Sequence, residues 1–148
     1  MALTPKWIQR LLRWLFSPDS RSFDRIVLSA AALRQIAAFA KTAHPDEFSA
    51  LLEGRVLEKT LRITNVVYQH YEATERSAII TLDYPIGTRI VGTVHSHSGN
   101  GKRPSAADRR YFNKYGFVNF IICHPYRVQD LACYGADGQE LAFRTRQP

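Results

Sequence analysis

The segment 89–108 of this 148-residue chain reads RIVGTVHSHSGNGKRPSAAD, and the prediction of both fold and chemistry starts from it. Residues 89–97 predict a strand, in which side chains two positions apart point to the same face. His95 and His97 therefore present two imidazoles to one point. A loop rich in glycine and proline follows, and Ser105 then opens a predicted helix that ends at Gly116, with Asp108 in its first turn.

These residue types predict a catalytic zinc site. Two imidazole nitrogens and one carboxylate oxygen, from His95, His97 and Asp108, leave the fourth position of a tetrahedral ion open. Water bound at such a position has a pKa lowered to roughly 7 and becomes a nucleophile near neutral pH. The reaction also needs a base, and Glu47, between a predicted helix and a predicted strand, is the best candidate.

Each of these features also has a simpler interpretation. Ser105 and Asp108 could only cap their helix, and a histidine in a strand is often a structural residue. The other histidines, His44, His70 and His124, have no ligand-like partner in the sequence, which favours surface or hydrogen-bonding roles. Two cysteines are too few for a disulfide scaffold, so we expect both to be reduced and buried, although their separation could place them opposite each other in a hairpin. These are Cys123 and Cys133.

The order of elements along the chain predicts an α+β domain in which a curved mixed sheet packs against helices. Ser29 is a plausible N-cap for a helix that runs to about Thr42. β-branched and apolar runs between turn residues predict strands at 25–28, 48–53, 61–68, 78–82, 89–97, 117–123, 130–134 and 140–144.

The first 22 residues are predicted to be a separate appendage, and residues 23–148 the domain. Residues 6–16 have apolar positions at helical spacing with arginines set away from most of them, which is typical of an amphipathic basic helix. Ser17-Pro18-Asp19-Ser20 then ends it. Such a helix packs on its own domain or on a second copy, or makes weak contact with a membrane surface.

Composition and charge restrict the partners and the location. Hydrophobic residues make up 45% of the chain and charged residues 22%, as expected for a globular protein. Neither a membrane-spanning run nor a secretory signal is apparent, so we expect a cytoplasmic protein. The net charge of +7 favours acidic partners, but the basic residues are dispersed, which indicates a solvated basic surface and no specific nucleic-acid site.

A glutamate followed by His-Ser-His, seven residues, a serine, two residues and an aspartate resembles the JAMM signature of the MPN-plus zinc metallopeptidases. The segment 44–54 is also similar to that family's segment around its glutamate, and the resemblance covers residues 25–135. It implies a cytidine deaminase-like MPN fold and a compact prokaryotic, archaeal-type member. It also implies that Glu47 moves the proton from water to the leaving amine, and that Ser105 stabilises the oxyanion.

The resemblance further implies a zinc-dependent isopeptidase or peptidase that cleaves at the C-terminal Gly-Gly of a ubiquitin-like or sulfur-carrier protein. A homodimer is compatible with it. The chain departs from many members in having Ser98 where they have proline, and it is too short for the insertions that give linkage specificity. Two alternatives stay open: a non-enzymatic MPN scaffold module, and a DNA-associated protein resembling RadC.

Overall fold

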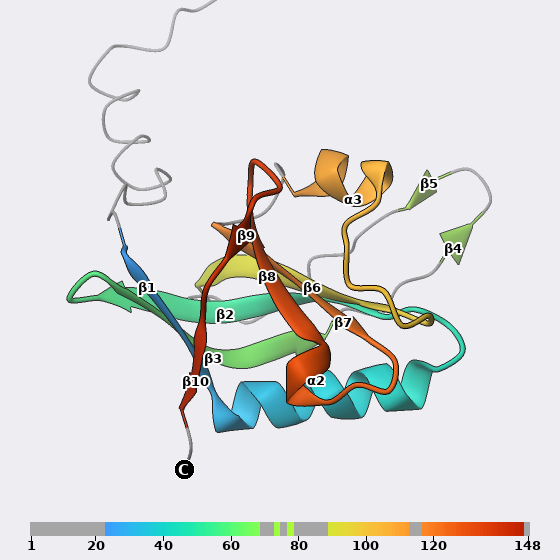
Figure 1. The fold of residues 1–148 in the computed structure, drawn as a ribbon, viewed down its shortest axis with the longest axis horizontal. Helices are drawn as coiled ribbons and strands as arrows, with labels where there is room; N and C mark the ends of the chain where they lie inside the picture. Colours follow the sequence, from blue (N-terminus) through green and yellow to red (C-terminus); the bar gives the residue numbers. More distant parts are fainter. Residues whose placement is uncertain (1–22, 69–72, 75–76, 79–88, 113–116, 147–148) are drawn as a thin grey trace, which may run out of the picture.

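The computed structural model describes residues 23–68, 73–74, 77–78, 89–112 and 117–146 (Figure 1). Its elements, in chain order, are β1 (Arg25–Ser29), α2 (Ala30–Ala43), β2 (Ser49–Leu57), β3 (Thr60–Tyr68), β4 (Ala73–Thr74), β5 (Ser77–Ala78), β6 (Ile90–His97), α3 (Ala106–Tyr111), β7 (Val118–Cys123), the 3-10 helix η1 (Val128–Asp130), β8 (Leu131–Gly135), β9 (Glu140–Leu141) and β10 (Arg144–Arg146). Strands β4 and β5 pair antiparallel with each other in a separate two-stranded sheet.

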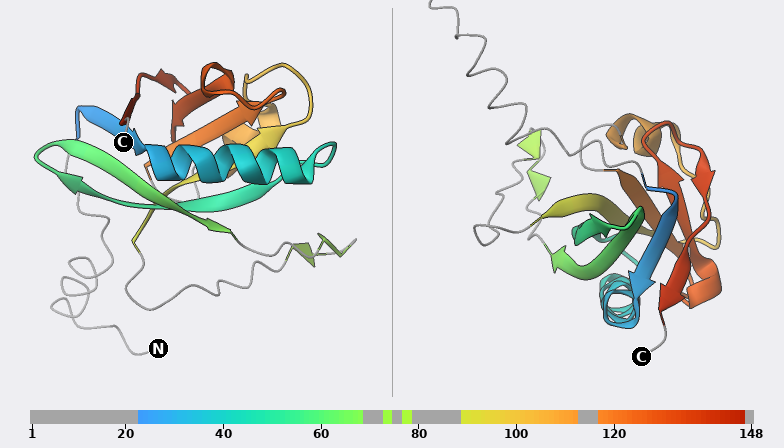
Figure 2. Two further views of the ribbon diagram at one scale, coloured as in Figure 1. Left: turned by 90° about the horizontal axis from the view of Figure 1, so that it is seen from below. Right: turned by 90° about the vertical axis from the view of Figure 1, so that its left-hand side faces the viewer.

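The main sheet has eight strands in the order β10-β1-β3-β2-β6-β7-β8-β9. It is mixed, with β1 parallel to β10 and β3, and β6 parallel to β7. The two edge strands, β9 and β10, are separated along the chain only by Ala142 and Phe143. The sheet must therefore curl until one short stretch of chain supplies both of its edges, as the views in Figure 2 show.

Helix α2 covers one face of this sheet. Ser29 caps it by accepting a hydrogen bond from the Ala32 N–H at 3.1 Å. One side of the helix carries Ala32, Ile36 and Ala40, all fully buried against sheet residues such as Leu52. Burial of a side chain the size of Ile36 contributes about 1.5–3 kcal/mol to the stability of the fold. The larger of the two clusters of buried apolar residues lies between α2 and the sheet, and it is the main core of the domain.

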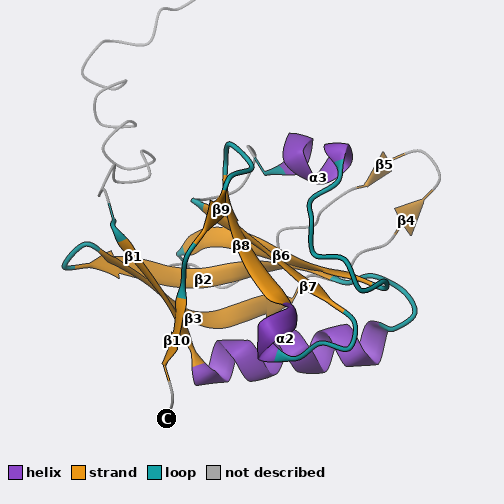
Figure 3. Cartoon of the chain, in the orientation of Figure 1, coloured by secondary structure: helices purple, strands orange, loops and turns teal. Residues whose placement is uncertain are grey.

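The opposite face carries the shorter helix α3 and a second apolar cluster (Figure 3). Phe112, just after α3, packs with Ile121, Ala132 and Tyr134. Neighbouring residues of β7 point to opposite faces, so Phe120 belongs to the α2 layer while Ile121 belongs to the α3 layer. Since His95 is paired with Ile121, it lies on the α3 face of the sheet.

The α+β fold with a curved mixed sheet is confirmed, while three predicted boundaries are wrong. Helix α3 ends at Tyr111, where we predicted Gly116. The predicted strand 140–144 is two strands, because the chain leaves β8 after Leu141 and pairs with β1 from Arg144. Strand β2 also continues beyond Glu53 through Gly54, where the Arg62 carbonyl oxygen of β3 leaves no room for a Cβ.

Some predictions lie outside the described residues. These are the amphipathic helix at 6–16, His70, and all but the first residue of the strand at 78–82. The division of the chain into residues 1–22 and 23–148 stays a prediction. Within the described ranges, no helix is long and apolar enough to cross a membrane.

Both cysteines are free and buried, as expected. The register between β7 and β8 pairs Cys133 with Phe120, three residues before Cys123, so the two thiols do not face each other across the hairpin. Burial raises the pKa of the Cys133 thiol to about 12 and also raises the pKa of Cys123. Neither thiol is therefore a thiolate at neutral pH.

We predict that iodoacetamide at pH 8 labels neither cysteine in the folded protein and labels both after denaturation without reductant, because both are buried thiols. Mass spectrometry of the intact protein measures the added mass. A denatured, unreduced sample that takes up no label would reveal a disulfide and contradict the pairing described above.

Candidate metal centre

The end of β6 holds two imidazoles side by side. His95 is paired with Ser49 of β2 on one side and with Ile121 of β7 on the other. Because His95 and His97 are two residues apart in this strand, both rings project to the α3 face. Their Nε2 atoms lie 3.2 Å apart, so the two nitrogens converge on one point.

Helix α3 adds a carboxylate to this point. The Oδ1 of Asp108 lies 3.1 Å from Nε2 of His95, and its Oδ2 lies 3.3 Å from Nε2 of His97. The helix start fixes the carboxylate, since Ser105 N–H donates to Asp108 Oδ2 at 2.6 Å and Asp108 N–H donates to Ser105 Oγ at 3.1 Å. The two hydrogen bonds that cap α3 thus also hold the Asp108 carboxylate beside the two imidazoles.

The protonation states suit metal binding. The Nδ1 of His97 lies 2.9 Å from the Gly101 carbonyl, which can only accept a hydrogen bond, so the contact selects the tautomer with the proton on Nδ1 and the lone pair on Nε2. Burial lowers the pKa of His95, outweighing the opposite effect of the Asp108 carboxylate, and keeps this imidazole neutral at pH 7. Burial alone would raise the pKa of Asp108, but the hydrogen bonds from Ser105 lower it below its usual value.

The loop between β6 and α3 is tied to the neighbouring strands and so carries Gly101 at a fixed place. His124 N–H donates to the Gly99 carbonyl at 2.9 Å, and the Tyr134 hydroxyl donates to the Lys102 carbonyl at 2.8 Å. These two hydrogen bonds hold the loop in place before and after Gly101. The hydrogen bond that selects the tautomer of His97 therefore belongs to an ordered part of the structure.

Zinc fits the three side chains. Their donor atoms all lie within 4.8 Å of one another, and the closest pairs are 3.1–3.3 Å apart. A tetrahedral zinc ion with bonds near 2.0–2.1 Å separates its ligand atoms by about 3.3 Å. Two imidazoles and a carboxylate at this spacing are a zinc donor set, and three protein ligands leave a fourth position for the reacting groups.

Glu47 reaches the same edge of the sheet but lies outside this group of three. Its side chain is exposed, at the residue before Phe48, where the chain enters β2. Burial lowers the pKa of His95, and the negative charge of the Glu47 carboxylate has a smaller effect that raises it, which indicates that Glu47 lies near His95. The structure thus places all five residues predicted from the sequence at one end of β6 and α3.

Sequence reasoning missed Ser96, which ties the Glu47 segment to β6. The Phe48 N–H donates to Ser96 Oγ at 2.9 Å, and the Ser96 N–H donates to the Phe48 carbonyl at 3.0 Å. Ser96 is fully buried on the face opposite the two histidines. The sequence does contain a signal for this role of Ser96. A residue between two predicted ligands in a strand must point to the opposite face of the sheet, because successive side chains of a strand alternate between the two faces.

Two further histidines have structural contacts. His44 Nδ1 lies 2.8 Å from the Tyr126 hydroxyl, and its ring stacks on His124 with centroids 4.9 Å apart. The predicted hydrogen-bonding role of His44 is therefore confirmed. No group that could hold a metal includes either residue in the part of the chain that the structure describes.

Comparison with known families decides the relationship. The sequence profile of the prokaryotic homologues of the JAB domain matches residues 29–134. The chain belongs to this family. The matched range contains the whole JAB-domain site described above, from Glu47 to Asp108, and ends within β8.

Two relatives of this JAB-domain protein cover most of the chain. It is 30% identical over 131 residues to a "probable metalloprotease" of Haloferax volcanii, covering 80% of this chain and 78% of the relative. It is 32% identical to a JAB1/MPN domain protein from Archaeoglobus fulgidus, with a TM-score of 0.66 over 81% of this chain and 98% of the other. These comparisons support a metallopeptidase.

Two other solved structures share the fold. One is described as the JAMM metalloprotease-like zinc site in the proteasome and signalosome, and it is 29% identical with a TM-score of 0.65 over 83% of this chain and 99% of the other. A protein from Desulfitobacterium hafniense is 22% identical with a TM-score of 0.59 over 83% and 94% of the two chains, which shows a common fold. Together with the donor set, the first of these two structures supports zinc as the metal.

We predict that Ser96→Ala loosens the Glu47 segment without removing zinc, since it deletes the acceptor of the buried Phe48 N–H. The loss of this partner lowers the free energy of unfolding by about 1–3 kcal/mol. In the zinc-loaded protein, hydrogen exchange measured by NMR becomes faster at the Phe48 amide. Ser96→Thr keeps a hydroxyl and retains most of the protection, whereas unchanged exchange in Ser96→Ala would contradict the role of Ser96.

Proposed function

We propose that this JAB-domain protein is a zinc-dependent peptidase or isopeptidase that hydrolyses the bond following the C-terminal Gly-Gly of a ubiquitin-like or sulfur-carrier protein. The observation that carries the proposal is the convergence of His95, His97 and Asp108 with donor atoms 3.1–3.3 Å apart. Zinc bound by three protein ligands acts as a Lewis acid that polarises a carbonyl and acidifies water. A scaffold module would have no need of this donor set.

Glu47 is proposed to be the general base. Its exposed carboxylate can reach solvent, and its influence on the pKa of His95 indicates that it lies near the metal ligands. It would accept a proton from the attacking water and deliver that proton to the amine that leaves. The hydrogen bonds between Phe48 and Ser96 hold its backbone against β6 during this transfer.

Ser105 is proposed to stabilise the negative charge that develops on the scissile carbonyl oxygen. Its backbone N–H is already bonded to Asp108, and its Oγ accepts from the Asp108 N–H. The hydroxyl proton has no acceptor among the residues that the structure describes, so it can donate to the substrate. Ser105 thus serves as helix cap and as oxyanion donor at once, and the two interpretations of this residue are compatible.

The limited access to the ligands supports a glycine-ended substrate. Their side chains are only 12% exposed at His95 and 18% exposed at His97 and Asp108. A peptide bond can approach such a recessed site when the preceding residues have no side chains, because glycine lets the backbone come close. This is the physical reason to expect Gly-Gly before the scissile bond.

We predict that the zinc-loaded protein releases free modifier from fusions in which a ubiquitin-like or sulfur-carrier protein ending in Gly-Gly is joined to a reporter. Glu47→Gln lowers the rate of release by about a hundredfold or more, since proton transfer typically contributes that much. Zinc content stays unchanged, because the three ligands remain.

Glu58→Gln, at the exposed turn between β2 and β3, is the matched control and keeps the full rate. Release is measured by mass spectrometry, which also locates the cleaved bond. Equal rates for Glu47→Gln and the original protein would contradict the base, and no release from any of these fusions would contradict the proposed function.

A further inference from the structure

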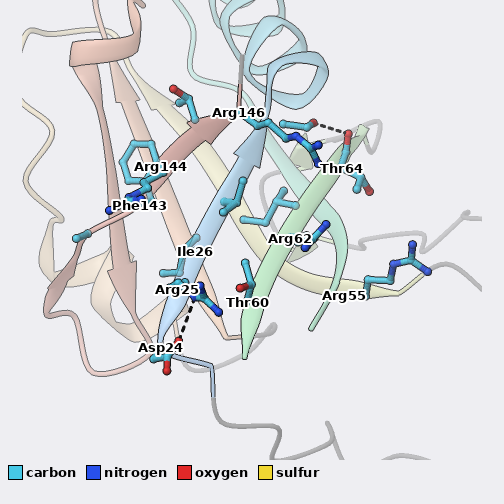
Figure 4. Close-up of a pocket in the computed structure, with 15 residues that line it drawn as sticks. Asp24, Arg25, Ile26, Arg55, Thr60, Arg62, Thr64, Phe143, Arg144 and Arg146 are labelled. Atoms are coloured by element: carbon cyan, nitrogen blue, oxygen red, sulfur yellow. Dashed lines mark hydrogen bonds and ion pairs between the residues drawn. The ribbon is translucent and has the colours of Figure 1, made fainter. Parts of the chain in front are cut away.

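Five arginines gather on one face of the sheet, at the end formed by β10, β1, β3 and β2. The strand registers pair Arg55 with Arg62, Arg62 with Val27, and Val27 with Arg144, so these side chains form a row across four strands. Residues two apart share a face, which adds Arg25 beside Val27 and Arg146 beside Arg144. Figure 4 shows the five arginines spread over this face, with β1 in the middle.

These arginines line a groove with a volume of about 850 Å³. We call it the arginine groove and define it by Arg25, Arg55, Arg62, Arg144 and Arg146. All of its lining residues come from β1, β2, β3, β10 and the connections beside them. The face is therefore hollowed, and the hollow is lined by positive charge.

Most of this charge is not neutralised by the residues that the structure describes. The one carboxylate that lines the groove is that of Asp24, which lies 3.5 Å from Arg25. The other four arginines have no carboxylate partner in the described part of the chain. Like charges directly opposite in a sheet, as at Arg55 and Arg62, cost up to about 1 kcal/mol, so the free domain retains an unfavourable arrangement that an anion would relieve.

The arginine groove lies on the same sheet face as the metal centre. His95 is paired with Ser49 of β2, and Arg55 follows six residues further along that strand. An even number of residues preserves the face, and six residues of antiparallel strand span about 20 Å. A single protein substrate of ordinary size can therefore touch both places at once.

We propose that the arginine groove binds an acidic segment of the polypeptide substrate while the scissile bond lies at the metal centre. This inference rests on the proposed function, because it names a property of the same substrate. Guanidinium groups form paired hydrogen bonds with carboxylates, which suits glutamate and aspartate side chains. The groove would thus select conjugates whose modifier or target protein carries a cluster of acidic residues.

The lining residues favour a polypeptide over nucleic acid or a membrane. Single-stranded nucleic acid binds through stacking on open aromatic faces, but the one aromatic lining residue, Phe143, packs edge-to-face against Phe120, with centroids 5.2 Å apart and an interplanar angle of 75°. The groove is lined by neighbouring strands of the broad main sheet, and a helix or an isolated two-stranded ribbon that could enter the major groove of a duplex is not part of its lining. A membrane surface would require exposed aromatic or apolar anchors, and among the described residues none of the large exposed apolar side chains lines the groove.

The direct test is binding of fluorescein-labelled octaglutamate, followed by fluorescence anisotropy at one fixed ionic strength. Arg55→Glu combined with Arg144→Glu should weaken binding by about tenfold or more, because two charge-assisted contacts become repulsive. Both residues are exposed, so circular dichroism should show the fold intact. The matched control combines Arg34→Glu with Lys41→Glu on α2, which makes the same change in net charge on the other side of the sheet.

The control variant should bind octaglutamate within about twofold of the original protein, because its substitutions lie far from the groove and act only through the screened net charge. An equal loss in both variants would show that net charge alone governs binding and would overturn the proposal. Tighter binding of octathymidylate or of phosphatidylserine vesicles than of octaglutamate would overturn the choice of a polypeptide. This experiment measures binding and not hydrolysis. A protein that binds octaglutamate at the arginine groove but cleaves no fusion would therefore contradict the proposed hydrolase function and leave the proposal for the groove intact.

Discussion

The alternation of side chains at the end of β6 is the constraint on which the metal centre depends. His95 and His97 face α3, while Ser96 between them is buried toward α2 and hydrogen bonds with Phe48. The same three residues therefore supply two metal ligands and hold the segment that carries Glu47. A change of register by one residue would turn both imidazoles into the core and expose the serine.

The third ligand depends on a second local rule. Asp108 occupies the position of a helix start where a carboxylate is hydrogen bonded by the capping residue, and this contact both lowers its pKa and directs it toward the histidines. The sequence offered two interpretations of Ser105 and Asp108, a cap or a functional pair. In the structure they coincide, because the cap is what fixes the carboxylate beside the imidazoles.

Features set by short spacings could be predicted from the sequence, and features set by pairing between distant strands could not. The strand 89–97 and the cap at Ser105 follow from local periodicity and turn chemistry. The approach of Glu47 to His95 requires the pairing of β2 with β6, and the sequence alone made Glu47 a candidate without a position. For the same reason the sequence predicts that the strand 48–53 ends before Gly54, whereas the close contact of Gly54 with β3 continues it.

The arginine groove illustrates the same limit more strongly. Its five arginines are scattered from residue 25 to residue 146, so the sequence shows only a dispersed excess of positive charge. The registers of four strands bring them into one hollow, on the face that also carries the metal centre. Five of the 20 basic residues of the chain are thus gathered at one place in the fold, although their positions in the sequence are dispersed.

X-ray absorption at the zinc edge of the zinc-loaded protein tests the central claim most directly. The account predicts one zinc ion with two imidazole nitrogens and oxygen ligands, all at about 2.0–2.2 Å, and no sulfur, because Cys123 and Cys133 are buried away from the site. A sulfur shell near 2.3 Å, or a spectrum without imidazole scattering, would contradict a site formed by His95, His97 and Asp108.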